Sequence, residues 1–202
     1  WQVADFEAVA KNIALQSAVL LKNEQNLLPL QSGMSVAVVG AMAKKPHVQG
    51  AGSSRVHPRR MVPFLDALRE EQLDWDYAQG YDLGGKQNAL LEQEALDLCR
   101  GKDAVLFFAG LRDTEEAESY DRLHLELPET QNALIEKIAS VNPNVVVVLH
   151  TGSPVRLPWL GKVKAVLLMG LAGQMVGAAT LELILGRVNP SGKLAETWPL
   201  AL

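Results

Sequence analysis

Residues 104–128 read AVLFFAGLRDTEEAESYDRLHLELP, and this stretch joins the most apolar part of the chain to its most acidic part. The segment Ala104–Ala109 is continuously apolar, which is typical of a strand buried on both faces of a parallel sheet. Residues 129–141 then show helical periodicity. A strand, a loop and a helix in this order predict an α/β unit. Loop 110–128 would lie at the carboxyl end of its strand, where ligands bind in open α/β sheets.

Loop 110–128 is dense in carboxylates, and a solvated acidic surface loop would show the same charge density. Two features favour a functional loop instead. Tyr120-Asp121-Arg122 follows the acids directly, and alternating leucines (123, 125, 127) then lead to Pro128, which predicts an extended segment pinned to the protein body. The acidic residues are Asp113, Glu115, Glu116, Glu118 and Asp121.

The rest of the chain repeats the alternation of strand and helix. Apolar runs predict strands at residues 35–40, 73–78, 103–109, 145–149 and 163–168, and helical periodicity covers residues 5–23, 62–71, 87–100, 129–141 and 175–185. This order predicts a three-layer α/β sandwich, with a mainly parallel sheet of about six strands and helices on both faces. Right-handed crossovers would place the loops after Gly40, Ala109, Leu149 and Leu168 at one edge of the sheet.

The first and third helices have predicted core faces. In residues 5–23, Asp5 would cap the helix, and an apolar stripe runs along it. The third helix, 87–100, has a similar stripe and ends at Gly101. The stripes are Phe6, Val9, Ile13, Leu20 and Leu21 in the first helix, and Leu90, Leu91, Ala95 and Leu98 in the third.

Composition bounds the class of protein. A length of 202 residues with 48% hydrophobic content predicts one domain with a substantial core, and a net charge of −4 argues against a nucleic-acid surface. A single cysteine, Cys99, allows no internal disulfide and argues against structural zinc. No apolar run reaches the length of a membrane span. The chain starts at Trp1, which indicates a piece of a longer protein whose signal peptide would be invisible here. A lone thiol favours a cytoplasmic location.

A second candidate loop, residues 41–60, contains GAGSSR at positions 50–55. It lacks the glycine spacing and the lysine of phosphate-binding loops, which disfavours nucleotide binding. Glycines would allow tight bends here, and the hydroxyls of Ser53 and Ser54 would face a cleft, although plain turn chemistry explains both serines equally well. We expect this loop and loop 110–128 to share a cleft rim.

Motifs spread over nearly the whole chain, in an unbroken order, suggest a family. Their family patterns are V-L-L-K-N-x-x-x-L-L-P-L, V-A-V-V-G, G-x-G-S-x-x-V, E-G-Y-D-R…L-P and G-x-x-N-P-S-G-K-L-P-x-T-F-P. The matching stretches are residues 17–24 with 27–30, 36–40, 50–56, 118–122 with 127–128, and 186–194 with Pro199. Together they resemble the second, α/β-sandwich domain of glycoside hydrolase family 3, the β-glucosidase group. Ser119, Ala195 and Trp198 depart from the usual glycine, proline and phenylalanine. Ser119 matters most, because glycine there would allow a bend beside the acid.

The resemblance implies a retaining glycosidase, most often acting on β-glucosides, whose active site is split between two domains. Such enzymes use two carboxyl groups about 5 to 5.5 Å apart. A preceding (β/α)8 barrel would supply an aspartate nucleophile, so this chain alone would be inactive. By motif position Glu118 would be the acid/base, with Glu116 as the second candidate. Ser53 would contact a sugar hydroxyl, and Asp121 and Arg122 would support the loop as an ion pair. The resemblance implies no cofactor and no metal.

Other residues have structural interpretations. His150 is predicted to be a hydrogen-bonded histidine at a strand end rather than a catalytic one, and His57 and His124 show no metal-ligand spacing. Trp159 and Trp198 could stack on sugar rings, although packing is the commoner role near a domain boundary.

Three classes of function remain open: half of a glycosidase site, a sugar-binding or interdomain module without activity, and a flavodoxin-like nucleotide-binding domain. β-Xylosidase or N-acetylglucosaminidase specificity is a further alternative to β-glucosidase. We adopt the glycosidase interpretation, with a β-glycoside as substrate and the barrel domain as partner.

Overall fold

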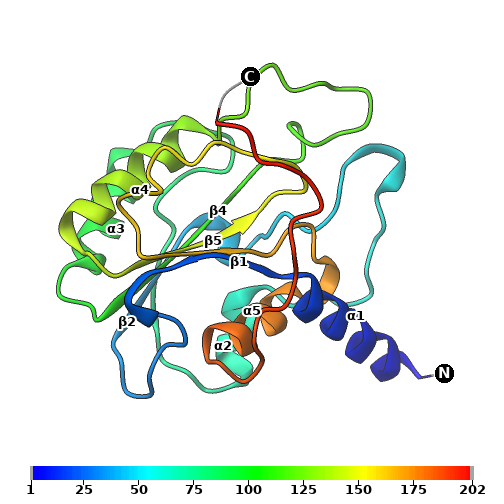
Figure 1. Ribbon diagram of the computed structural model, residues 1–202, viewed down its shortest axis with the longest axis horizontal. Coiled ribbons are helices and arrows are strands. Elements are labelled where there is room, and N and C mark those ends of the chain that lie inside the picture. Colours follow the sequence, from blue (N-terminus) through cyan, green and yellow to red (C-terminus); the bar gives the residue numbers. More distant parts are fainter. Residues whose placement is uncertain (1, 201–202) are drawn as a thin grey trace.

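The apolar run that precedes the acidic loop forms β4, Ala104–Gly110, which is buried along its whole length inside a six-stranded sheet. The computed structural model, shown in Figure 1, describes residues 2–200. The sheet order is β1-β6-β5-β4-β2-β3. The other strands are β1 Val19–Asn23, β2 Val36–Val39, β3 Asp76–Ala78, β5 Val145–His150 and β6 Ala165–Leu168.

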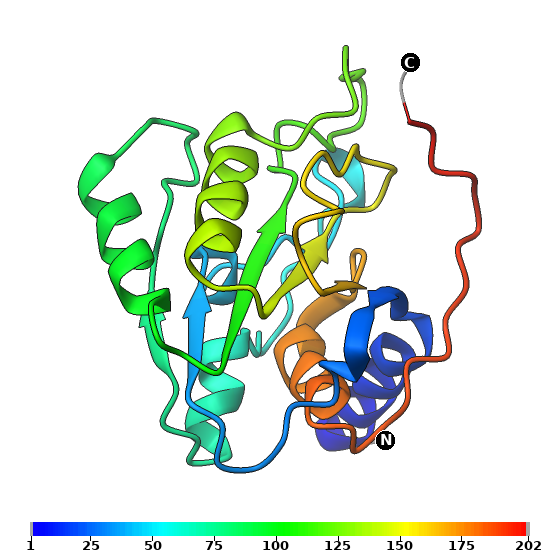
Figure 2. The same ribbon diagram turned by 60° about the vertical axis from the view of Figure 1, so that its left-hand side comes forward.

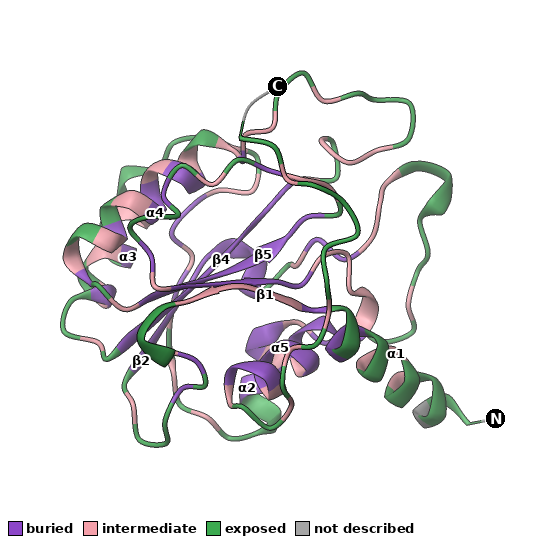
Figure 3. Cartoon of the chain, viewed as in Figure 1, coloured by how far each residue is buried: buried purple, intermediate pink, exposed green. Residues whose placement is uncertain are grey.

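Helices cover both faces of this sheet (Figures 1 and 2). On one face α3 (Ala89–Cys99) packs beside α4 (Glu129–Val141), and on the other α1 (Val3–Ser17) and α2 (Phe64–Glu70) both pack against α5 (Val176–Ile184). Figure 3 shows buried residues concentrated in the strands and on the inner sides of the helices. The predicted α/β fold, with a mostly parallel sheet between helical layers, is therefore confirmed.

The carboxyl ends of the central strands meet at one edge of the sheet. β2, β4, β5 and β6 run parallel, with Phe107 beside Val39 and Gly110 beside His150. The loops after β2, β4 and β5 therefore leave the sheet together, as the crossover rule predicts. Gly110 is required here because a Cβ on it would lie 2.0 Å from the carbonyl oxygen of His150.

The prediction of one helix over residues 5–23 is wrong for its last residues, 18–23. The helix α1 ends at Ser17, and Val19–Asn23 forms β1, the only antiparallel strand of the described sheet. The reason is tertiary: this segment pairs with β6 at the sheet edge, through Val19 and Leu20 and then, after a register shift, through Lys22 and Asn23. The pairing satisfies backbone groups that would otherwise be unpaired. Asp5 lies inside the first turn, where its carboxylate accepts a hydrogen bond of 2.9 Å from the Gln2 amide.

The predicted core stripes of α1 and α3 are also partly wrong. Phe6, Val9 and Ile13 are 57%, 52% and 62% exposed, respectively. Among the described side chains of α1 the buried residues are Ala14 and Leu15, and Ala18 directly after the helix is also buried. In α3, Leu90 is 83% exposed, whereas Ala95 and Cys99 are buried. Hydropathy alone therefore predicts the wrong buried face for these helices, because close packing can bury a face of small residues in place of a face of large ones.

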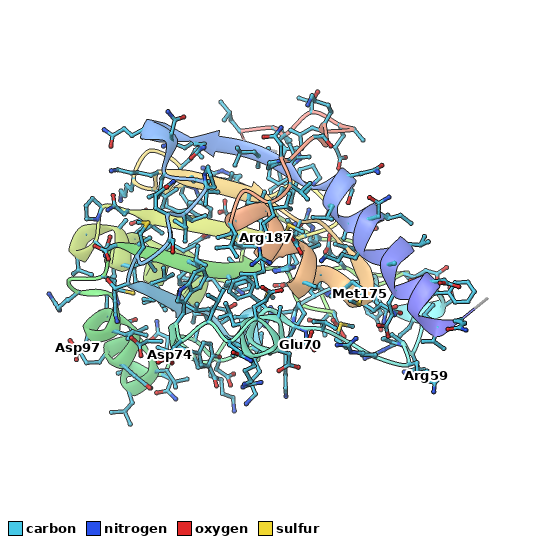
Figure 4. The ribbon with its side chains drawn as sticks, turned by 90° about the horizontal axis from the view of Figure 1, so that it is seen from below. Arg59, Glu70, Asp74, Asp97, Met175 and Arg187 are labelled. Atoms are coloured by element: carbon cyan, nitrogen blue, oxygen red, sulfur yellow. The ribbon has the colours of Figure 1, made fainter. Side chains whose placement is uncertain are left out.

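The contact between α2 and α5 depends on a glycine. The Gly177 amide donates to the Val62 carbonyl at 2.9 Å, and a Cβ on Gly177 would lie 2.2 Å from the carbonyl carbon of Pro63. Figure 4 views this helical layer from below and labels Glu70 at the end of α2, Met175 just before α5 and Arg187 just after it. The backbone just before α2 therefore lies directly against the first turn of α5.

We expect Gly177→Ala to lower the free energy of unfolding by about 3 kcal/mol, at the upper end of overpacking effects, because the new methyl group meets backbone rather than a mobile side chain. Urea denaturation measures this. Gly161→Ala is the matched control, since a Cβ there meets nothing within 4 Å, and its effect should stay within about 0.5 kcal/mol. Equal effects of the two substitutions would contradict the packing argument.

Candidate functional site

The loops that leave β2, β4 and β5 converge into one polar cluster. A parallel backbone bridge joins Ala51 in loop 41–60 to Ala117 in loop 110–128. The Ala51 amide donates to the Glu116 carbonyl at 3.0 Å, and the Glu118 amide donates to the Ala51 carbonyl at 3.4 Å. The two candidate loops thus lie side by side, as the sequence predicts, and the bridge fixes the backbone on both sides of Ala117.

Glu118 is exposed and points to Ser53. Its Oε2 accepts hydrogen bonds from the Ser53 hydroxyl and from the Ser53 amide, the latter at 3.2 Å. The hydroxyl bond, followed by the amide bond, lowers the pKa of the Glu118 carboxyl below its ordinary value. The structure therefore brings together two residues that the sequence analysis singled out separately.

Glu116 has the opposite environment, and its side chain is only 9% exposed. Its carboxylate accepts from the Gly152 amide at 3.0 Å and from the Ser153 hydroxyl at 2.5 Å, and lies 3.0 Å from Nε2 of His47. Burial by itself raises the pKa of Glu116, but the bonds from His47, Gly152 and Ser153 outweigh it and lower the pKa. This carboxylate is therefore held ionised inside the protein.

His47 is buried between two carboxylates. Nδ1 lies 3.1 Å from Oδ1 of Asp113, and Nε2 lies 3.0 Å from Oε2 of Glu116. Burial alone lowers the pKa of His47, but the hydrogen bonds and charges of Glu116, and then those of Asp113, raise it above its ordinary value. Arg55 lies 3.7 Å from Asp113 at the outer side of this cluster.

His150 does not have the hydrogen bonds that the sequence analysis expected. Among the described residues neither ring nitrogen has a partner, and the ring stacks on Phe108 at a centroid distance of 6.0 Å. Burial, and secondarily the charge of His47, lower the pKa of His150 to about 3. The residue is therefore a neutral core group behind the cluster.

The remaining acids of loop 110–128 divide into paired and unpaired residues. Glu115 binds the backbone amide and the guanidinium of Arg112, at 2.8 and 2.6 Å. The expected ion pair between Asp121 and Arg122 is absent from the described part of the chain. Arg122 donates instead to the Pro154 carbonyl at 2.7 Å, because the loop packs on the segment after β5. These contacts argue against the interpretation of residues 110–128 as a freely solvated acidic loop.

The downstream segment is held from Leu125 onwards, where the Leu125 carbonyl accepts a hydrogen bond of 2.7 Å from the Arg156 amide. Leu123 is 91% exposed, whereas Leu127 is 2% exposed and anchors the segment just before α4. Tyr120, beside the acids, is 74% exposed. Ser119 adopts a φ of 72°, so the bend that glycine would favour is present with serine. Ser119 therefore occupies the left-handed region that glycine adopts more readily than other residues.

Other candidates lie in the core or on the surface. Trp159 is fully buried and donates to Asn132 at 2.8 Å, so it is a packing residue rather than a sugar platform. Trp198 packs against the core while partly exposed. Within residues 2–200 no cluster of His, Cys, Asp and Glu has the arrangement of a metal site, and no helix is long and apolar enough to cross a membrane.

The sequence analysis missed the buried half of the cluster. His47, Gly152 and Ser153 hold Glu116, yet none of them stands in a recognisable motif. The available signal was positional, because each follows a buried parallel strand and the carboxyl ends of such strands meet at one edge. Spacing along the chain could not show which of these residues would touch.

Comparison with known proteins places this geometry in a family. The sequence model of the glycosyl hydrolase family 3 C-terminal domain matches residues 18–202. The chain is 44% identical over 199 residues to thermostable β-glucosidase B of Acetivibrio thermocellus, covering 96% of this chain and 26% of that protein. It is 40% identical over 205 residues to an exo-α-(1→6)-L-arabinopyranosidase of Bifidobacterium longum, covering 96% and 27%.

Solved structures agree. The crystal structure of a GH3 β-glucosidase from Bifidobacterium adolescentis superimposes with a TM-score of 0.95 at 39% identity, covering 100% of this chain and 30% of that one. The chain thus spans between a quarter and a third of the length of these relatives. Both the sequence match and the fold show that it belongs to the glycosyl hydrolase family 3 C-terminal domain family.

Proposed function

We propose that this chain supplies the general acid/base of a retaining glycoside hydrolase, with Glu118 in that role. The observation that carries the proposal is the contrast between the two candidate carboxylates. Glu118 is exposed on a loop that the Ala51–Ala117 bridge and Ser53 hold in place. A general acid must reach the leaving oxygen of a substrate, and an exposed carboxyl at the sheet edge can do so.

Glu116 is less suited to the same role. Both of its oxygens are engaged by His47, Gly152 and Ser153, and its side chain is buried. Proton transfer to a substrate would require this carboxylate to break several hydrogen bonds and to leave a site that stabilises its charged form. Glu116 therefore remains the second candidate.

Glu118 requires a covering partner before it can act as an acid. An acid that operates near neutral pH needs a raised pKa, and the pKa of Glu118 in this chain is lowered. Burial against a second domain, close to a second carboxylate, would raise it. We propose that a (β/α)8 barrel in the parent protein covers this edge and supplies the aspartate nucleophile. Tyr120 and Leu123, which follow Glu118 in the same loop, have large exposed side chains. Their exposure supports the proposal that another surface covers this loop.

The proposed reaction has two steps. Glu118 protonates the glycosidic oxygen while the barrel carboxylate attacks the anomeric carbon, giving a covalent glycosyl-enzyme. Glu118, now ionised, then takes a proton from the incoming water, which releases the sugar and restores the acid. A sugar hydroxyl that reached Ser53 would lie next to this carboxyl, because Ser53 already bonds to Glu118. Arg122 would support the loop from behind, through its hydrogen bond to the Pro154 carbonyl.

A β-glucoside is the proposed substrate. One relative is a β-glucosidase and another acts on an L-arabinopyranoside, so the sugar varies among proteins that resemble this chain. A β-xyloside or an N-acetylglucosaminide remains an alternative. The role proposed for Glu118 is proton transfer at the leaving oxygen. All these substrates need that step, so the role does not depend on the sugar.

The 202-residue chain alone should show no hydrolysis of a panel of 4-nitrophenyl glycosides, because the nucleophile would lie on another domain. Circular dichroism would first establish that the chain is folded. Release of nitrophenol at a rate well above the spontaneous one would mean that both carboxylates lie within this chain, and the divided-site proposal would be wrong.

In the full-length parent enzyme, Glu118→Gly should lower kcat/KM for phenyl glycosides by about 10²- to 10⁴-fold, the range of general acid catalysis. Activated 2,4-dinitrophenyl glycosides need no acid, so their kcat/KM should stay within about threefold of the wild type. Their turnover should stall at the glycosyl-enzyme, and azide should restore it by attacking that intermediate and giving a glycosyl azide.

Glu116→Gly serves as the comparison in the same assays. Azide rescue should be confined to the Glu118 variant, because only the residue that deprotonates water leaves room for azide at the anomeric carbon. Azide rescue of Glu116→Gly in place of Glu118→Gly would transfer the acid/base role to Glu116.

A further inference from the structure

We propose that Glu116 and His47 are positioning residues that hold the Glu118 carboxyl in place, through a buried contact that ties the loops after β2, β4 and β5 together. This inference rests on the proposed function of Glu118. Neither residue touches the substrate in this account; both act through the backbone of the loop that carries the acid.

The first step is the way Glu116 joins the loops. It stands on the loop after β4, and its carboxylate binds His47 on the loop after β2 and Gly152 and Ser153 after β5. Few side chains could replace it, because the site supplies donors from several directions to a group that has only acceptors. Loss of this carboxylate would leave those donors unpaired at a buried position.

The second step links Glu116 to Glu118. The residue between them, Ala117, forms the bridge with Ala51, and the Glu116 carbonyl and the Glu118 amide both bond to Ala51. In loop 41–60, His47 comes before the bridging residue Ala51 and Ser53 comes after it. Loop 41–60 therefore bonds to the Glu116 side chain through His47 and to the Glu118 side chain through Ser53. A shift of Glu116 must move the backbone that orients Glu118.

The third step concerns the proton on His47. Carboxylate oxygens only accept hydrogen bonds, so both ring nitrogens must donate to satisfy Asp113 and Glu116, and the ring must be an imidazolium. The charged groups around it agree with this state. Asp113 and Glu116 flank the ring, Arg55 meets the far side of Asp113, and His150 behind the ring is neutral.

Because a 1 Å displacement of a catalytic group can cost about a hundredfold in rate, the test compares leaving groups in the full-length enzyme. Glu116→Ala and His47→Ala should lower kcat/KM about 10- to 100-fold for the phenyl glycoside of the preferred sugar. The loss for the 2,4-dinitrophenyl glycoside should be less than about threefold, because that substrate does not need the acid. His47→Gln should recover most of the phenyl activity, since its amide can still donate to Glu116.

His57→Gln is the matched control, because His57 is an exposed histidine of the same loop, and it should leave both activities unchanged. Glu116→Gln, which keeps the side-chain size, decides the matter if the alanine variants do not fold. Equal losses with both leaving groups, or no loss, would overturn the positioning role. If Glu118→Gly itself fails to distinguish the leaving groups, the proposed function is wrong; if only the Glu116 and His47 variants fail to do so, this inference alone is wrong.

The same contact predicts a pH dependence of stability. The pKa of His47 is raised above 6.5, so its stabilising effect is complete below that value and is lost as pH rises through the raised pKa. The pKa of Glu116 is lowered from 4.5, so its effect is present above that value and is lost in acid. The contact is therefore strongest between about pH 4.5 and pH 6.5, and its contribution to stability falls as pH rises from there through the raised pKa of His47.

Urea denaturation of the 202-residue chain checks this window. The stability advantage of the wild type over His47→Gln should be largest near pH 6 and should shrink towards pH 9, because glutamine does not titrate. Taking the difference cancels groups that titrate equally in both proteins. An advantage that stays constant or grows with pH would show that His47 does not carry the proton on which the contact depends.

Discussion

The constraint on which this structure depends is the parallel pairing of buried strands. β2, β4, β5 and β6 are apolar on both faces, so each must be covered by helices and joined to the next by a crossover. Their carboxyl ends consequently lie at one edge, and loops far apart in sequence become neighbours. The cluster of His47, Glu116, Glu118 and Ser153 exists because of this shared edge.

Within that cluster, two glutamates two residues apart have opposite environments. Glu116 is held by donors on two other loops and stays charged inside the protein. Glu118 is exposed, and within residues 2–200 its carboxylate bonds to Ser53 alone. The difference arises from the bridge at Ala117, which fixes the backbone between them. A buried, fully bonded carboxylate gives rigidity to the loop, and an exposed one remains available for chemistry. A rigid support next to a reactive group is a common requirement of catalytic sites.

The electrostatics of the chain also explain why the proposed activity would need a second domain. Both glutamates have lowered pKa values here, so neither is prepared to donate a proton at neutral pH. For Glu116 the cause lies within this chain, in the hydrogen bonds from His47, Gly152 and Ser153. For Glu118 it is an exposed contact with Ser53, which a covering surface could change by removing water and adding a like charge. In this view, assembly of the two domains is itself the step that activates the acid.

Much of the fold followed from sequence patterns, because continuous apolar runs such as Val145–Leu149 and helical periodicity in residues 129–141 are local signals of buried strands and helices. The motif around Glu118 and the serine loop near Ser53 were visible in the same way. The conversion of Val19–Asn23 into a strand was not, since an edge strand is defined by the partner it meets, here β6. The pairing of His47 with Glu116 was equally invisible in the sequence. A contact between residues 69 positions apart depends on where three strands end in space, and only the tertiary structure decides that.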